Sequence, residues 1–469
     1  MNNMYRNIPK VDLIIEALCD ESLDVFSHRE KSDAARDVLD EIRGEIKNLD
    51  LNNQDDIVDI EKKLSLEFIV GMAKNRLTKS MEKSLKKVIN ATGVVLHTNL
   101  GRANLSKRAI EAVEKIAGEY STLEYDESIG ERGSRHAHTE ELITKITGAE
   151  ASIVVNNNAA ATMIVLAAMA RGGEVIVSRG ELVEIGGSFR IPDIMKESGA
   201  VLKEIGTTNK TKPGDYEDAI NENTKAILKV HTSNYKVVGF TQEASLPELK
   251  EIAVENDLPL IYDMGSGLLR DLRKYGIGEP CVEDAINEGA DLVLFSGDKL
   301  LGGAQAGIII GKKEYVDRLK KHPLARALRV DKMTIAAICE TFRAYLNEDT
   351  VNDEIPVLKM LTSDIDDLFE RARKLEDLII SKSQIINTDI IKTKNKVGGG
   401  SAPDTELDGY AVVINIEDMT PDDIEMALRA GEIPIVARIT NNQLLLDVRT
   451  IRDEDIDYIA NRIKEIAMS

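Results

Sequence analysis

The sequence predicts an α/β protein with a mainly parallel sheet, a helical N-terminal domain and a smaller α+β C-terminal domain. Three observations carry this prediction. The N-terminal part shows only helical spacing of apolar residues, the middle alternates short apolar runs with helical stretches, and the last part combines one long helix with strands. A chain of 469 residues is also too long for a single compact core. We place the domains at residues 1–78, 79–345 and 346–469.

The N-terminal domain is expected to be a small bundle of three amphipathic helices. Apolar residues recur at helical spacing around residues 11–18, 35–46 and 55–76. The third helix is expected to bury Ile57, Ile60, Leu64 and Phe68 on one face. Such a bundle most often serves packing or dimerisation, and the stretch KSMEKSLKK (79–87) after it is typical of a linker.

The middle of the chain is expected to form a parallel sheet that helices cover on both faces. Six apolar runs each end in polar or glycine residues, and helical stretches separate most of them; the runs are ASIVVNNN, GGEVIVSRG, GAVLKEIG, KAILKVH, LPLIYDMG and ADLVLFSG. A further apolar run, Ile308 to Ile310, follows the last of them. In parallel sheets the ligand lies beyond the carboxyl ends of the strands, where the polar clusters of this chain are found.

The C-terminal part predicts a long charged helix, SDIDDLFERARKLEDLI (363–379), followed by strands in GYAVVINI, IPIVARI and QLLLDVR. Asn441 and Asn442 separate the last two of these strands, which is typical of a tight hairpin turn. The glycine-rich stretch KVGGGSAPD (396–404) favours a flexible loop.

The charge and the apolar pattern of the sequence argue against some classes of function. A formal net charge of −21 argues against general nucleic-acid affinity but leaves room for a local basic patch. No apolar stretch reaches membrane-spanning length, and the first residues lack the pattern of a signal peptide. We therefore expect a cytoplasmic protein without a membrane partner.

Two strand ends carry residues that suit a pyridoxal phosphate (PLP) enzyme. Lys299 follows one strand in FSGDKLLGG, and Asp263 follows another in IYDMGSG. PLP needs a lysine to form a Schiff base and a carboxylate to keep the pyridine nitrogen protonated. The polar turn Asn156–Asn158 opens an alanine-rich helix, whose N-terminus could bind the phosphate. Small glycines around Lys299 would leave room for cofactor and substrate.

Each of these features has a plainer explanation. A lysine in a turn usually points to water, an Asp-x-Gly stretch is a common turn, and NNNAAA could be an ordinary helix cap. Other cofactors fit less well, since the chain has no phosphate-binding G-x-x-x-x-G-K-[ST] motif. His136 and His138 lack a third ligand at useful spacing, so we expect solvated loop histidines and no metal site. Together and in this order, the strand-end residues favour a PLP enzyme.

At these residues the chain resembles the bacterial selenocysteine synthases, the L-seryl-tRNA(Sec) selenium transferases, which are fold-type I PLP enzymes. The resemblance covers essentially the whole chain and is carried by INATGVVLHTNLGRA, TLEYD, NNNAAA, SRGELVEIGGSFRIPDIM, GTTNKT, KVHTSNY, SGDKLLGG and HPLARALRVDK. These motifs are long and unusual. The sequence departs from the family at Ala304, where we expect proline, which bears on loop stiffness more than on chemistry.

The resemblance implies a role for each matching residue. Lys299 would bind PLP and act in catalysis, and Asp298 beside it would support proton transfer. Residues assigned to cofactor binding are Lys299, Asp263, Asn157, Asn158, Ala159, His231 and Ser296. Arg102, Arg326 and Arg329 would hold the anionic selenium donor, selenophosphate. The last two lie at i and i+3, so on one helix face they could grip a single phosphate.

The resemblance also implies the reaction and the partners. Seryl-tRNA(Sec) would become selenocysteinyl-tRNA(Sec) with selenophosphate as donor, through a PLP-bound aminoacrylyl intermediate. The helical N-terminal domain would bind the tRNA, local basic patches such as KSMEKSLKK would contribute, and the chain would form a homo-oligomer, a decamer whose active sites form in dimers. His231, Ser233 and Asn234 could contact the seryl group or terminal ribose, or be structural.

Two alternatives stay open. One is a related PLP lyase that acts on a small amino acid or amino sugar phosphate, and the other is a tRNA-binding or scaffolding protein with a decayed PLP site. The N-terminal bundle and HPLARALR favour the transferase over the first, and the intact Lys299, Asp263 and Asp298 argue against the second.

Overall fold

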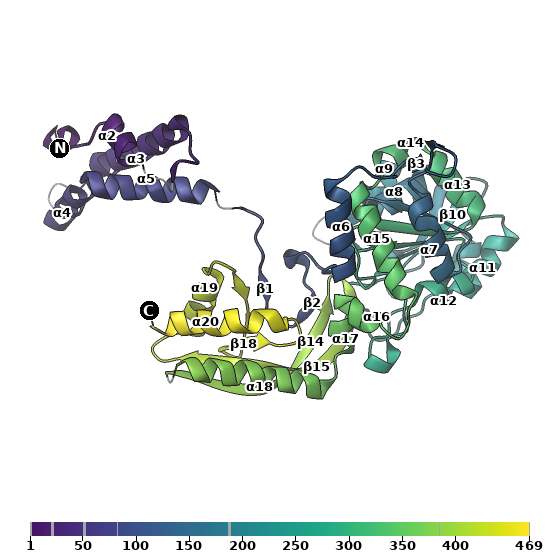
Figure 1. Cartoon of the computed structure of the whole chain (residues 1–469). Helices are drawn as coiled ribbons and strands as arrows, with labels where there is room; N and C mark the ends of the chain where they lie inside the picture. Colours follow the sequence, from purple (N-terminus) through teal and green to yellow (C-terminus); the bar gives the residue numbers. More distant parts are fainter. Residues whose placement is uncertain are drawn as a thin grey trace. The chain divides into compact units, whose positions relative to one another are not determined.

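The computed structural model describes residues 2–19, 23–49, 53–81, 83–185, 189–383 and 385–468. The chain divides into two compact units, residues 1–87 and 88–469, which are described separately (Figure 1). No helix within the described ranges has the length and apolar character needed to cross a membrane.

The N-terminal unit is a helical bundle, as predicted. Its helices are α1 (Asn2–Arg6), α2 (Val11–Ala17), α3 (His28–Asn48), α4 (Gln54–Lys63) and α5 (Leu66–Met81). A capping box between Ser27 and Glu30 begins α3, because each residue's side chain satisfies a backbone N–H of the other. The unit has its own core, which includes Ile14, Leu39 and Ile42.

The predicted third helix is two helices, α4 and α5, with a break at Leu64 and Ser65. Leu64 is buried as expected, but Phe68 is 41% exposed and Ile69 is buried in its place. The break changes the register of the helix, so the apolar face of α5 does not continue the face of α4.

The second unit contains a seven-stranded sheet that is mainly parallel, which confirms the predicted fold class. Its strand order is β5-β13-β12-β11-β10-β6-β9, and β13 alone runs antiparallel to both of its neighbours. The strands are β5 (Ala151–Val155), β6 (Glu174–Ser178), β9 (Val201–Ile205), β10 (Thr224–Val230), β11 (Leu260–Gly265), β12 (Leu292–Ser296) and β13 (Gly307–Gly311). The six runs predicted as strands are all present, although β9 is a partly exposed edge strand.

Helices cover both faces of this sheet, and each face has its own apolar core. Neighbouring residues of one strand, such as Ile153 and Val154, point into opposite cores, as the strand period of two requires. One face packs against α8 (Asn158–Met169), α9 (Ile191–Ser198) and α13 (Lys313–Lys321). The other packs against α7 (Ala137–Thr147), α11 (Leu246–Glu255), α12 (Val282–Asn287) and α15 (Lys332–Tyr345), and α6 (Lys107–Gly118) lies against α15.

A five-stranded sheet of order β17-β18-β15-β14-β2 forms the C-terminal part of this unit. Its strands are β2 (Val94–Leu96), β14 (Ile386–Gly398), β15 (Ser401–Ile416), β17 (Arg438–Thr440) and β18 (Gln443–Asp447). The helices α18 (Ile365–Lys382), α19 (Pro421–Arg429) and α20 (Ile456–Met468) share a core with it. The segment at residues 89–96 thus joins C-terminal strands, since β1 (Ile89–Asn90) also pairs with β16 (Ile435–Val436).

Short elements connect these layers. They are β3 (Tyr125–Asp126), β4 (Glu131–Arg132), β7 (Glu184–Ile185), β8 (Phe189–Arg190), α10 (Pro213–Glu217), α14 (Pro323–Ala327), α16 (Val351–Glu354) and α17 (Pro356–Thr362).

Two turn predictions have opposite outcomes. The hairpin at Asn441 and Asn442 is confirmed, with both residues at the positive φ that a tight turn requires. The expectation of a flexible loop at residues 396–404 is wrong, because β14 and β15 continue as a paired hairpin to Gly398 and Ser401. A Cβ at Gly398 would lie 2.4 Å from Val94 Cγ1, so glycine here lets the hairpin approach β2.

Candidate active site

Lys299 is a buried amine. It follows β12 and is only 5% exposed, so the expectation of a solvated turn lysine does not apply. Burial, reinforced by the charge of Arg102, lowers the pKa of Lys299 below the ordinary lysine value. No hydrogen bond joins its Nζ to another residue in the described part of the chain. Lys299 therefore has the environment of a reactive amine.

The glycines around Lys299 serve close packing of the loop, which corrects their interpretation as room for ligands. A Cβ at Gly297 would lie 2.4 Å from the Ala304 carbonyl oxygen, and a Cβ at Gly302 would lie 2.3 Å from Ile355 Cγ2. Backbone hydrogen bonds from Gly303 to Gly297 and from Gly297 to Ala306, both 2.8 Å, close the loop. The loop thus holds Lys299 in one position.

Asp263 lies on β11, the strand beside β12, and is 4% exposed. Its carboxylate accepts hydrogen bonds from Asn158 Nδ2 at 2.8 Å and from Thr162 Oγ1 at 2.9 Å. Burial raises the pKa of Asp263, while these two bonds and the charge of Lys299 oppose the rise. A cation placed beside Asp263 would favour its ionised form.

The N-terminus of α8 faces the same region. Asn157 caps the helix by accepting a hydrogen bond from the Ala160 N–H at 2.9 Å. The first N–H groups of a helix have no intrahelical partner and attract anions. Asn158 Oδ1 is buried without a hydrogen-bond partner among the described residues. A Cβ at Gly307 would lie 2.1 Å from the Asn157 carbonyl oxygen, so glycine on β13 lets this turn approach the sheet.

Asp298, the neighbour of Lys299, forms an ion pair with Arg102 at 2.8 Å, and their side chains are 12% and 27% exposed. Arg102 lies in a loop with φ of 62°, a left-handed conformation that costs free energy for a residue with a Cβ. The Ala103 N–H also donates to the Asp298 carbonyl at 3.3 Å. Two contacts thus attach this loop, which precedes the large sheet in sequence, to the Lys299 turn.

Glu279 is a part of the site that sequence reasoning missed. Its carboxylate contacts His231 Nε2 at 3.1 Å and accepts hydrogen bonds from Ser266 Oγ at 2.9 Å and the Ala402 N–H at 2.8 Å. Burial acts to raise the pKa of Glu279, but these partners bring it below the ordinary value. Glu279 lies in no recognisable motif, and its partners come from distant parts of the chain.

One cavity of about 260 Å³ brings most of the predicted residues together. The predicted residues in its lining are Arg102, Asn157, Asn158, Ala159, His231, Asp263, Ser296, Asp298 and Lys299. Sequence reasoning did not assign Val183, Ile191, Val230, Gly265 and Gln305, which also line it. Ser233, considered only as a substrate contact or a structural residue, lines it too, and its buried Oγ has no partner in the described ranges. Asn234 has a structural contact, since its Nδ2 donates to the Glu184 carbonyl.

Arg326 and Arg329 line a different cavity, of about 310 Å³, which shares no lining residue with the Lys299 cavity. The expectation that both lie on one helix face is wrong, because α14 ends at Ala327 and Arg329 forms a backbone bridge with Val155. Their side chains still line the same cavity, and Arg329 lies 3.5 Å from Glu124.

The expected solvated histidines are partly buried instead. His136 lines the cavity of Arg326 and Arg329, and burial lowers its pKa. His138 Nε2 lies 3.1 Å from the Leu123 carbonyl oxygen. His136 is the N-cap residue of α7 and His138 lies in its first turn. Because α7 packs against the sheet, these histidines are not part of an exposed loop, as the sequence had suggested.

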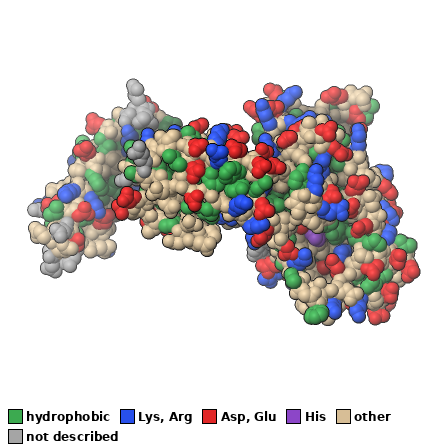
Figure 2. Space-filling view, turned by 90° about the horizontal axis from the view of Figure 1, so that it is seen from below, with side chains coloured by type: hydrophobic (Ala, Val, Ile, Leu, Met, Phe, Trp, Pro, Cys, Tyr) green, Lys and Arg blue, Asp and Glu red, His purple; other side chains and the backbone are tan. Residues whose placement is uncertain are grey.

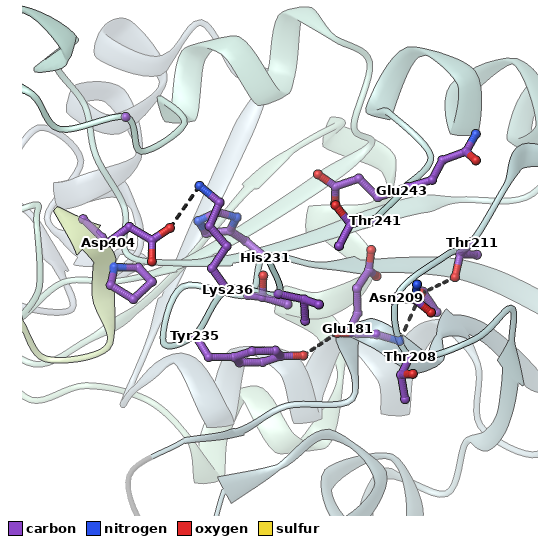
Figure 3. A pocket seen from close by; sticks show the side chains of 18 of the residues that line it. Glu181, Thr208, Asn209, Thr211, His231, Tyr235, Lys236, Thr241, Glu243 and Asp404 are labelled. Carbon is purple, nitrogen blue, oxygen red and sulfur yellow. Dashed lines mark hydrogen bonds and ion pairs between the residues drawn. The ribbon is translucent and has the colours of Figure 1, made fainter. Parts of the chain in front are cut away.

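A third cavity, of about 730 Å³, adjoins the Lys299 cavity and shares His231 with it (Figure 3). On the face drawn in Figure 2, the acidic and basic side chains of the described residues are intermingled. Binding of a polyanion would therefore depend on local groups of cations, as the net charge also indicates.

The sequence of the chain is similar to that of a known protein family. Residues 88–452 match the family profile described as L-seryl-tRNA selenium transferase. The chain is 47% identical over 464 residues to the L-seryl-tRNA(Sec) selenium transferase of Clostridium perfringens, covering 99% of this chain and 98% of the relative. It is 46% identical over 467 residues to the protein of the same name from Clostridium botulinum, with the same coverage.

A solved structure, that of D-glucosaminate-6-phosphate ammonia-lyase, is similar with a TM-score of 0.56 and 24% identity. The match covers 82% of this chain and 96% of the other. This likeness is one of fold, and it agrees with the predicted α/β architecture with a mainly parallel sheet.

Proposed function

The chain belongs to the L-seryl-tRNA selenium transferase family, and from this membership we propose that it converts seryl-tRNA(Sec) to selenocysteinyl-tRNA(Sec) with selenophosphate as donor. One structural observation supports the proposal most strongly. A buried amine of lowered pKa, Lys299, shares a cavity with the Asp263 carboxylate and the N-terminus of α8. This is the set of groups that PLP requires.

The residues of the Lys299 cavity fit PLP. Lys299 would hold the aldehyde carbon, Asp263 would pair with the protonated ring nitrogen, and the N–H groups at the start of α8 would bind the phosphate. The buried Ser233 Oγ and Asn158 Oδ1, without partners in the described ranges, would gain hydrogen bonds from a polar ligand. A Cβ at Gly265 would lie 3.3 Å from Ser233 Oγ and 3.9 Å from Lys299 Nζ, so glycine keeps this space open.

When bound, PLP would supply an aldehyde that condenses with amines and a ring that accepts electrons from the substrate α-carbon. Lys299 contributes an amine that loses its proton more readily than an ordinary lysine, because burial lowers its pKa, and such an amine could accept the α-proton. Asp298 places a negative charge next to Lys299, which stabilises the ammonium ion that forms, and Arg102 holds the Asp298 carboxylate in place.

The proposed substrate explains why the Lys299 cavity needs no arginine to bind a substrate carboxylate. An amino acid esterified to tRNA has no free carboxylate, so an arginine clamp for that group is not required. Arg102 can then serve the anionic donor, together with Arg326 and Arg329. Because the two cavities of one chain share no residue, we propose a homo-oligomer in which copies bring these arginines together. The N-terminal unit, which the chemistry does not need, is proposed to bind the tRNA.

A substrate comparison tests the proposed function. Purified protein loaded with PLP is given selenophosphate with seryl-tRNA(Sec), seryl-tRNA(Ser) or free serine, and selenocysteine formation is measured. We expect turnover with seryl-tRNA(Sec) in clear preference to the other two. Turnover with free serine alone would support the alternative, a related PLP lyase, and would overturn the proposal.

A further inference from the structure

The largest cavity described, of about 730 Å³, extends from the Lys299 cavity and has no role in the chemistry above. Five segments line it (Figure 3): residues 178–181 at the end of β6, the loop at residues 207–211 after β9, the loop at residues 231–243 after β10, residues 276–279, and residues 402–406 at the beginning of β15. His231 lines both cavities, and its partner Glu279 lines the larger one. A ligand that reaches from one cavity into the other must therefore pass His231.

The charge of this cavity disfavours phosphate. Its lining includes five carboxylates but only two lysines, and the buried Lys229 behind it adds one more cation. The carboxylates are Glu181, Glu243, Glu279, Asp404 and Glu406. Lys236 is already paired with Asp404 at 3.0 Å, and Lys229 pairs with Glu181 and Glu243. The excess of negative charge selects against an anion and leaves neutral or cationic ligands.

The remaining lining is rich in groups that hydrogen-bond neutral ligands. The loop after β9 supplies Thr207, Thr208 and Asn209, and the loop after β10 supplies Thr241 and Gln242. Hydroxyl and amide groups suit the hydroxyls of a sugar and the edge of a base. Tyr235, whose Oη donates to the Gly180 carbonyl at 2.5 Å, adds an aromatic ring on which a base could stack.

We propose that this cavity binds the terminal nucleoside to which the seryl group of the substrate is esterified. The inference rests on the proposed function, since only an aminoacyl-tRNA substrate places a ribose directly beside the reacting amino acid. When the seryl amine lies at Lys299, the ester lies beside His231. The neutral ribose and base then lie in the larger cavity. The nearest phosphate of the tRNA is attached on the side of the ribose opposite to the ester. It would therefore lie outside the cavity and away from its carboxylates.

The test uses two small probes on the PLP-loaded full chain. One is 3′-seryl-amino-3′-deoxyadenosine, in which a stable amide replaces the ester, and the other is serinamide, which lacks the nucleoside. Calorimetry measures their affinities for the wild type, Thr208→Trp, Thr241→Trp and Thr440→Trp. Thr208 and Thr241 are exposed residues of the cavity lining, so tryptophan there fills the cavity with little cost to folding. Thr440 is an exposed control in the C-terminal sheet, outside all three cavities.

We expect the wild type and Thr440→Trp to bind the nucleoside probe at least about tenfold more tightly than serinamide. Thr208→Trp and Thr241→Trp should lose this advantage and keep the affinity for serinamide. If both cavity variants bind the nucleoside probe as the wild type does, the nucleoside proposal is overturned, whether or not seryl-tRNA(Sec) is turned over. If the tenfold advantage is present and cavity-dependent but no selenium is transferred to seryl-tRNA(Sec), the nucleoside site stands and the proposed function fails.

Discussion

Two buried lysines, Lys229 on strand β10 and Lys299 in the turn after strand β12 of the same sheet, show why burial alone does not make a reactive amine. Lys229 lies on β10 and is 8% exposed, close to the 5% of Lys299. Its Nζ donates to Glu181 at 3.3 Å, to Glu243 at 3.2 Å and to the Ala244 carbonyl at 3.0 Å. Burial alone would lower the pKa of Lys229, but Glu181 and Glu243 reverse the effect and raise it.

Lys299 faces a cavity and has Arg102 as a neighbouring cation, so the same burial lowers its pKa. The partners of each amine therefore decide whether it is a structural cation or a reactive amine. Lys229 is held as a cation by its carboxylate and carbonyl acceptors, whereas Lys299 has a lowered pKa and no hydrogen-bond partner in the described part of the chain, so its amine is available for a ligand.

Lys299→Ala should have the largest effect. In the proposed function the amine holds PLP and accepts the α-proton, so without it turnover of seryl-tRNA(Sec) should fall by about a thousandfold or more. Single-turnover kinetics and the visible absorbance of the cofactor measure the two losses. Retention of both in the purified variant would show that Lys299 does not hold PLP.

Substitution of each lysine by methionine should separate the two roles by stability. Lys229→Met leaves Glu181 buried without its cation and should cost about 3–5 kcal/mol of the free energy of unfolding. Lys299→Met removes an amine without an anionic hydrogen-bond partner and should leave the apoprotein at least as stable as the wild type. Urea unfolding of the three apoproteins measures the difference. Equal losses in both variants would contradict the distinction.

Asp263→Asn should lower turnover by about a hundredfold while PLP stays attached to Lys299. The amide keeps the volume of the side chain but removes the charge that favours a protonated ring nitrogen. Absorbance reports attachment and turnover reports chemistry in the same sample. A matched control is Asp408→Asn, an exposed carboxylate of the C-terminal sheet paired with Lys394, which should leave both unchanged. If the Asp263 variant also behaves as the wild type, Asp263 has no role toward the ring.

The smallest effect concerns pH. Because the folded pKa of Lys299 lies below its ordinary value of 10.5, the unfolded chain binds more protons than the folded apoprotein between these two values. The stability of the wild type relative to Lys299→Met should therefore rise with pH in this window, by at most about 1.4 kcal/mol per pH unit. Urea unfolding at several pH values measures it. A relative stability that falls as pH rises would mean that the pKa of Lys299 is raised, as that of Lys229 is.

The grouping of the candidate residues was predictable where it follows from the topology of the sheet. Lys299 follows a strand, the Asn157 turn opens a helix, and Asp263 lies within the last residues of β11 and not after it, as the sequence had suggested. All three lie at the carboxyl ends of the strands, which meet at one edge of a parallel sheet. Arg329 was misplaced because spacing alone continued a helix that ends at Ala327. The hairpin at residues 396–404 was missed because a glycine run is compatible with both a flexible loop and a tight turn.

Glu279 and the Lys229 group could not be predicted for a different reason. Their partners are brought together by tertiary packing: Glu279 by a strand end, a turn and a C-terminal hairpin, and Lys229 by residues 181 and 243 from separate loops. No local pattern of residue types marks such an arrangement, and a single sequence gives no measure of which lysine is left without an anion.

The position of an attached cofactor distinguishes Lys299 from Lys229. The PLP-loaded wild type is reduced with borohydride and digested, and mass spectrometry locates the modified lysine. The label should lie on Lys299 and be absent from Lys229, since the pKa of Lys299 is lowered and its side chain lines the cavity, whereas Glu181 and Glu243 raise the pKa of Lys229. A label on Lys229, or no label on Lys299 in protein that contains PLP, would contradict this account.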